Sequence, residues 1–118
     1  MRLGLALVWL LHWLPLSLLA PLGRAIGRLL FAVARERRNV TLTNLKLCFP
    51  EWSDSERRRI AREHFQIVAR CLLEHGILWW APKERIQRMV RIEGLEHWEA
   101  VKDKSVIWLA PHFAGLDM

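Results

Sequence analysis

The chain has 118 residues, 53% of them hydrophobic, and a formal net charge of +6. This apolar content excludes a largely disordered protein. Two cysteines without a CxxC spacing, Cys48 and Cys71, exclude a disulfide scaffold and favour a reducing compartment. The excess of basic residues favours an anionic partner, such as a phospholipid surface, a nucleic acid or an acidic protein.

The positions of the charges favour a membrane over a nucleic acid. Residues 1–38 contain six arginines and one acidic residue, Glu36, whereas the rest of the chain is nearly balanced. The basic excess therefore lies beside the most apolar part of the chain, as in segments that bind the headgroups of anionic lipids.

Two membrane-seeking segments are predicted in residues 1–34. Leu3 to Ala20 is apolar and uncharged, and as a helix it would extend about 27 Å, close to the thickness of a hydrocarbon core. Pro15 would kink this helix. Leu22 to Arg35 has the pattern of an amphipathic helix lying among lipid headgroups. A retained anchor is preferred over a cleaved signal peptide or a pair of buried soluble helices. The arginines that follow the run predict that later residues face the cytoplasm.

Residues 35–118 are predicted to begin with helices. Arg37 to Pro50 forms a short helix, and Ser53 with Glu56 gives a capping box for a helix of about 22 residues. We expect this long helix to break near Gly76 and to end at Pro82, with a further helical turn over residues 83–89. Its predicted core-facing stripe consists of Ile60, His64, Ile67, Val68, Cys71, Leu72 and His75.

Two strands are predicted after the helices. Met89 to Glu93 alternates in polarity, and Ser105 to Ala110 (SVIWLA) is a continuous apolar run typical of a strand covered on both faces. Residues 94–101 form a short helix between them. The predicted class is therefore α/β, and because two strands make no covered sheet, residues 35–118 are expected to be the front part of a larger domain.

A histidine and an aspartate follow the second strand. His112 and Asp117 stand five positions apart in HFAGLD, where α/β folds place their chemistry. If the chain folds back, the Asp117 carboxylate can accept from the imidazole and leave its other nitrogen as a general base. The spacing alone favours a histidine that caps a helix, with an aspartate in its first turn.

The sequence resembles the lipid A late acyltransferases, the lauroyl/myristoyl branch of the lysophospholipid acyltransferases. The resemblance covers nearly the whole chain. It is carried by the apolar N-terminal run and by the strings RRNVTLTNLKLCFPEWSDSER, HFQIVARCLLEHGILWW, VRIEGLEHWEAV and SVIWLAPHFAGLD.

The resemblance implies an inner-membrane enzyme with a cytoplasmic active site. Such enzymes move a fatty acyl chain from acyl carrier protein, or sometimes coenzyme A, to a hydroxyl of a lipid A precursor. By position, His112 would be the general base and Asp117 its orienting partner, with no covalent acyl-enzyme, metal or cofactor. Further family blocks lie after Met118, so the chain is expected to be an N-terminal fragment that is inactive by itself.

Other features remain open between function and packing. Arg57, Arg58 and Arg59 could dock acyl carrier protein or lipid phosphate, or they could form a solvated face paired with Glu56 and Glu63. Trp79–Trp80 could line an acyl groove, contact the bilayer or pack at a helix end. Alternative functions are an acyltransferase for a lysophospholipid or glycolipid and a non-catalytic membrane-tethered protein. A nucleic-acid binder is the least favoured function.

Overall fold

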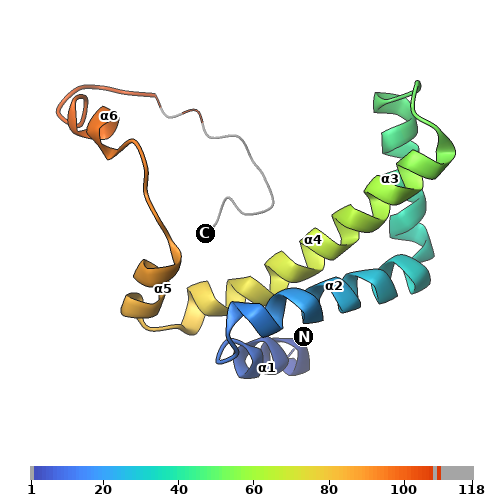
Figure 1. Ribbon diagram of the computed structural model, residues 1–118, viewed down its shortest axis with the longest axis horizontal. Coiled ribbons are helices and arrows are strands. Elements are labelled where there is room, and N and C mark those ends of the chain that lie inside the picture. The colour runs from blue at the N-terminus through green and yellow to red at the C-terminus, as the bar shows by residue number, and fades with distance from the viewer. Residues whose placement is uncertain (1, 108, 110–118) are drawn as a thin grey trace.

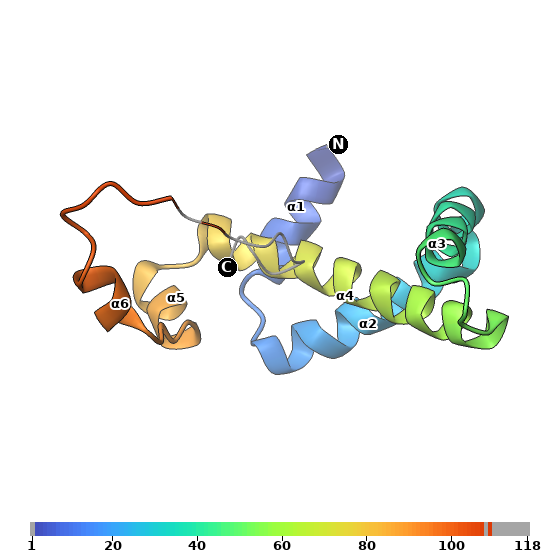
Figure 2. The same ribbon diagram turned by 90° about the horizontal axis from the view of Figure 1, so that it is seen from above.

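The architecture is helical throughout the part of the chain that can be described. The computed structural model describes residues 2–107 and 109, and these contain six helices and no strand. The helices are α1 (Arg2–Leu11), α2 (Leu16–Val33), α3 (Arg35–Cys48), α4 (Asp54–Trp80), α5 (Lys83–Met89) and α6 (Leu95–Glu99). Helices α2 and α4 lie side by side, with α1 beside the C-terminal end of α4 and α3 beside its N-terminal end (Figures 1 and 2).

The predicted α/β class is wrong for the described residues. Val90 has extended backbone angles, but no ladder of hydrogen bonds joins residues 89–93 to the described part of the second predicted strand, 105–107 and 109. A strand exists only when a neighbouring strand supplies its backbone partners. Ile107 is 99% exposed, so the run that was expected to be covered on both faces has no cover here.

The first apolar run is two helices and not one. Helix α1 ends at Leu11 and α2 begins after Pro15, so residues 12–15 form a turn inside the predicted span. Pro15 cannot donate a backbone hydrogen bond and takes the N-cap position of α2. As a result, the second half of the predicted anchor and the predicted interfacial segment form one continuous helix, α2, which runs through Pro21.

Small residues hold α2 against α4. The buried residues of α2 recur every four positions, at Leu19, Gly23, Gly27 and Phe31. A Cβ atom added to Gly27 would lie 2.6 Å from the carbonyl oxygen of Phe65, so only glycine permits this approach. The ring of Phe31 contacts that of Phe65 edge to face, with centroids 5.5 Å apart. This close approach of two backbones resembles the small-residue interfaces of membrane helices.

Helix α4 begins as the sequence predicts and continues further than expected. The Ser53 hydroxyl accepts from the Glu56 N–H at 3.2 Å, which confirms the N-cap. The helix passes through Gly76 unbroken, and α1 crosses α4 at this residue. A Cβ atom there would lie 2.8 Å from Cγ1 of Val8. Gly76 is therefore a contact position and not a helix end.

The core-facing stripe predicted for α4 is also wrong. Ile67, Val68 and Leu72 are exposed, whereas the apolar residues that face α2 and α1 are Ala61, Ala69, Leu73 and Ile77. Leu19 of α2 forms the main buried cluster with Leu73 and Ile77. The buried face of α4 thus combines small residues with two large ones near its C-terminal end.

Three arginines cap carbonyl groups at the helix ends. Arg38 donates to the carbonyls of Phe31 (2.8 Å) and Ala32 (3.1 Å) in the last turn of α2. Arg57 donates to the carbonyls of Phe49 and Pro50, which follow α3. Arg85 donates to the carbonyls of His12 and Leu14, in the turn that follows α1. Cations at these positions satisfy carbonyls that lack helical partners and complement the helix dipole.

Candidate functional site

The two predicted catalytic residues lie outside the described residues. His112 and Asp117 fall in the segment 110–118, so their mutual geometry stays a prediction. The chain approaches them through α6, which begins after Gly94 in the left-handed conformation (φ 79°). Beside α6 lies an apolar pocket of about 560 Å³. Its lining includes Trp98, Val101 and Ile107.

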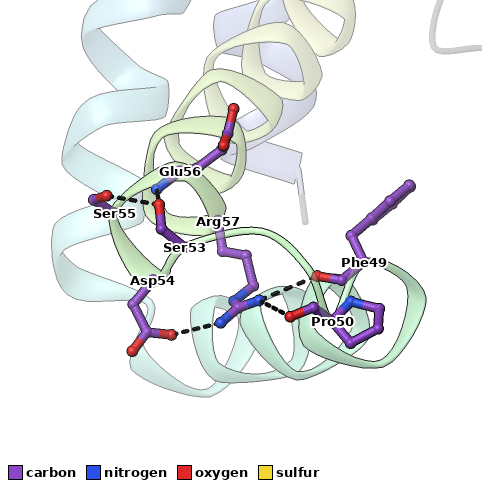
Figure 3. A network of polar contacts seen from close by, with 7 residues as sticks. All are labelled: Phe49, Pro50, Ser53, Asp54, Ser55, Glu56 and Arg57. Carbon is purple, nitrogen blue, oxygen red and sulfur yellow. Dashed lines mark hydrogen bonds and ion pairs between the residues drawn. The ribbon is translucent and has the colours of Figure 1, made fainter.

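Arg57, a weak candidate for substrate binding, is held by the protein itself. Its Nη1 donates to the carbonyl oxygens of Phe49 (3.1 Å) and Pro50 (3.4 Å). Its Nη2 donates to Oδ1 of Asp54 at 2.9 Å, and the residue is only 9% exposed (Figure 3). Ser53 lies in the same network and bonds the Ser55 hydroxyl at 2.9 Å. Arg57 therefore fixes the turn between α3 and α4.

The other two arginines of this cluster differ from each other. Arg59 is exposed and pairs with Glu63 (3.1 Å) and Glu56 (3.4 Å), which is the solvated face that the sequence allowed. Arg58 is exposed and makes no ion pair with any described residue. It lines a pocket of about 210 Å³ between α3 and α4, together with Lys46. Only Arg58 of the three keeps its charge available to an external anion.

Two titratable groups of α4 are perturbed. The hydrogen bond from Arg57 and the charge of that guanidinium hold the pKa of the Asp54 carboxyl below its ordinary value of 3.8. Burial raises the pKa of the Cys71 thiol, and the nearby Glu74 carboxylate raises it further. Cys71 is therefore a packed thiol and not an activated nucleophile.

The remaining residues singled out by the sequence have structural surroundings. His64 is exposed, contrary to its predicted place at the core, whereas half-buried His75 bonds the Cys71 carbonyl through Nδ1 at 2.7 Å. Trp79 and Trp80 contact edge to face at the end of α4 and are 59% and 37% exposed. This contact agrees with the packing at a helix end that the sequence allowed, and both side chains stay partly exposed.

Sequence reasoning missed the ring cluster at the turn between α1 and α2. The His12 ring is 2% exposed and its centroid lies 4.8 Å from that of Trp13 and 6.1 Å from that of Trp80. Its Nδ1 bonds the Trp9 carbonyl, and Arg85 donates to the His12 carbonyl. The spacing of His12 and Trp13 gave no sign of partners some 70 positions later in the chain.

Comparison with known proteins supplies the family. The family model for bacterial lipid A biosynthesis acyltransferases matches residues 1–118. The chain is 33% identical over 118 residues to the lipid A biosynthesis lauroyltransferase of Escherichia coli K12, covering 98% of this chain and 39% of that protein.

Two further relatives are also enzymes of lipid A biosynthesis. The palmitoleoyltransferase of the same strain is 31% identical over 117 residues (98% of this chain, 38% of the relative). Its myristoyltransferase is 37% identical over 103 residues (86% and 31%). The chain thus spans about two-fifths of the length of the first of these relatives, and no solved structure matches it. Because the match to the family model extends over all 118 residues, the chain belongs to the bacterial lipid A biosynthesis acyltransferase family.

Proposed function

We propose that this chain provides the membrane-binding part and the general base of an enzyme that transfers a fatty acyl chain to a hydroxyl of a lipid A precursor. The observation that carries the proposal is the family match over residues 1–118, which includes the His112–Asp117 spacing. The acyl donor is a thioester of acyl carrier protein or coenzyme A. The site of action is the cytoplasmic face of a bacterial inner membrane.

The proposed chemistry needs one imidazole and one carboxylate. The Asp117 carboxylate accepts from one ring nitrogen of His112, so the other nitrogen takes the proton of the acceptor hydroxyl. The alkoxide attacks the thioester carbonyl and forms a C–O bond. The tetrahedral intermediate then collapses with cleavage of the C–S bond, and the imidazolium returns the proton to the departing thiolate. This chemistry requires hydrogen-bond donors for the oxyanion, which we do not assign.

A chimera tests the proposal, since the curated relatives are longer than this chain. Residues 1–118 would be joined to the remaining part of the E. coli lauroyltransferase and expressed in a strain that lacks that enzyme. We expect mass spectrometry of lipid A to show one added acyl chain, and His112→Ala to abolish it. His97→Ala, at an exposed position of α6, is the matched control. Acylation that survives His112→Ala at equal membrane levels would refute the role of His112.

The same chimera separates the alternative functions. Purified membranes would be supplied in parallel with a lipid A precursor, a lysophospholipid and a glycolipid, each with labelled acyl carrier protein thioester. Transfer to the lysophospholipid or glycolipid alone would favour the related acyltransferase. No transfer to any acceptor, by a chimera present at normal levels, would favour a non-catalytic tethered protein.

Docking of the acyl donor is tested at Arg58. Arg58→Glu reverses an exposed charge that pairs with no described residue, whereas Arg57 is needed for the turn and is unsuitable. If the cluster docks acidic acyl carrier protein, the KM for this donor rises in Arg58→Glu while the KM for the acceptor stays constant. Arg59→Glu is the comparison, because Arg59 already pairs with two glutamates. An unchanged KM in both variants would leave the cluster as a solvated face.

A further inference from the structure

Helix α2 is long and apolar enough to span a membrane, but its charges are in the wrong place for a span. It is the one described helix whose length and composition satisfy such a test. Eight helical residues precede Arg24 and nine follow it, so Arg24 lies at the middle of the helix, and Arg28 lies one turn later. Both are exposed and neither pairs with a described residue. A spanning α2 would carry two uncompensated arginines close to the bilayer centre, where they are most costly.

The neighbour of α2 makes a span still less favourable. Gly23 lies against the backbone of Arg70, Gly27 against that of Gln66, and Phe31 against Phe65. Charged side chains of α4 lie there too, because Arg62 lies over the Phe31 ring, and Glu63 and Arg70 line a pocket together with Arg24. Because these contacts run along α2 from Leu19 to Phe31, α2 cannot enter the hydrocarbon as a span without drawing charged groups of α4 with it, or losing the contacts.

The free surface of α2 has the arrangement of a helix that lies in an interface. At 3.6 residues per turn, Leu18, Leu29 and Val33 share one side of the helix, and each is more than half exposed. Arg24 and Arg28 lie between this apolar side and the side that faces α4. The long arginine side chains at this edge can reach phosphates while the apolar side enters the acyl layer.

The turn before α2 adds side chains suited to the same layer. Trp13 is 66% exposed and Trp9 48% exposed, next to the N-terminal end of α2. Tryptophan is enriched at the level of lipid headgroups, where one edge of the ring is wet and the other apolar. The turn and α2 therefore present apolar, aromatic and cationic groups together.

We infer that α1 and α2 form a monotopic element, in which α2 lies parallel to the surface of an anionic phospholipid leaflet and does not cross it. Arg24 and Arg28 bind lipid phosphates. Leu18, Leu29 and Val33 enter the acyl layer, and α4 covers the opposite side of α2. The inference rests on the membrane attachment included in the proposed function, but not on acyl transfer. It places Ser17, in the first turn of α2, and Cys48, at the end of α3, on the same face of the membrane.

The decisive experiment measures binding of the whole purified chain to vesicles. The vesicles contain either equal parts phosphatidylglycerol and phosphatidylcholine, or phosphatidylcholine alone. The double variant Arg24→Gln/Arg28→Gln should bind the anionic vesicles about tenfold more weakly than the native chain. Lys83→Gln/Arg88→Gln is the matched control, because it removes two exposed charges from α5 without touching α2.

The alternatives predict results of opposite sign. If α2 spans the bilayer, removing two arginines from its middle makes insertion more favourable, so stronger or equal binding by the double variant would overturn the inference. Binding to neither vesicle by the native chain would overturn it as well, since α2 would then be an ordinary soluble helix. None of these readouts depends on acylation, so a failure of the proposed function would not resemble a failure of this inference.

Thiol labelling in membrane vesicles prepared from cells gives a second measurement that does not depend on purified protein. One variant carries Cys71→Ala and keeps exposed Cys48 as its single thiol. The other carries Ser17→Cys, Cys48→Ser and Cys71→Ala. In inside-out membrane vesicles, an impermeant maleimide should label both thiols from the same face. Labelling of only one of the two thiols in these vesicles would show that α2 crosses the membrane.

Discussion

Gly23 of α2 lies so close to Arg70 of α4 that a Cβ atom added to Gly23 would be 2.6 Å from the Cα of Arg70. The obstacle is backbone and not a flexible side-chain end. The two helices would have to separate to admit even one methyl group. The contact therefore depends on the absence of a side chain, and it sets the spacing of α2 and α4, the two longest of the described helices.

The first prediction concerns this contact. Gly23→Ala should lower the free energy of unfolding by about 1–3 kcal/mol, because overpacking at a backbone contact forces the helices apart. Gly4→Ala is the control, since nothing lies within 4 Å of a Cβ atom at Gly4 in α1. Thermal unfolding followed by circular dichroism in lipid nanodiscs measures both. Equal stability of the two variants would contradict the close approach of α2 and α4.

The second prediction concerns Arg85, which joins α5 to the turn between α1 and α2. Its Nη1 donates to the His12 carbonyl at 2.5 Å and its Nη2 to the Leu14 carbonyl at 2.7 Å. Arg85→Met should destabilise the chain by about 1.5–3 kcal/mol, as expected for loss of charged hydrogen bonds to partly buried acceptors. Arg88→Met is the matched variant, because among the described residues Arg88 bonds only the Glu84 carbonyl of its own helix.

Limited proteolysis would locate the effect of Arg85→Met. Cleavage should become faster at the turn formed by residues 12–15, while the start of α4 should keep its native rate. If cleavage accelerates equally everywhere, Arg85 stabilises the whole chain and not this turn in particular.

The third prediction is a pH dependence at Asp54. The pKa of this carboxyl is lower in the folded chain than its ordinary value of 3.8, because Arg57 bonds its charged form. Folding stability from the Asp54–Arg57 contact is therefore fully present above the unfolded pKa and is lost as the pH falls through the lower folded pKa. The difference in stability between the native chain and Asp54→Asn should be constant near neutral pH and should shrink below about pH 4.

Asp103→Asn corrects the Asp54 measurement for the change in net charge, because Asp103 lies in an exposed turn after α6. If the difference in stability between the native chain and Asp54→Asn stayed constant down to pH 2, Arg57 would not favour the charged form of Asp54.

The fourth prediction concerns the proposed base. In the chimera, Asp117→Asn should lower kcat by a factor of about 10² to 10⁴, in the range of a lost general base. The double variant with His112→Ala should be little slower than His112→Ala alone, because residues that act as one unit are not additive. Multiplicative losses would indicate that Asp117 acts on something other than His112.

Several helix boundaries could be predicted from local residues, but the strands could not. The N-cap residue Ser53 and the proline Pro82 marked the two ends of α4. Helix α5 has the predicted bounds. These signals act over a few residues and need no distant partner. The strand assigned to residues 105–110 rested on apolar content alone, which does not specify whether a second strand is present to pair with it.

The face of α4 was misassigned for a physical reason. The stripe predicted from large apolar residues includes Ile67 and Leu72, which are exposed, whereas Ala61 and Ala69 are buried. Where helices approach closely, small residues line the contact and large ones point outward, the reverse of a soluble core. The Gly23–Gly27 spacing was the available signal for this arrangement. The contacts of Arg85 lie more than 70 positions away and no local pattern indicates them.

The arginines that cap helix ends alter how the basic character of this chain should be understood. Arg38 and Arg85 each direct one guanidinium at two carbonyl groups, and Arg57 reaches two carbonyls and a carboxylate. A lysine ammonium lacks this rigid fork, so exchanging arginine for lysine at these sites should disturb folding. Intolerance to lysine at these three positions would therefore reflect backbone architecture and not recognition of a lipid headgroup.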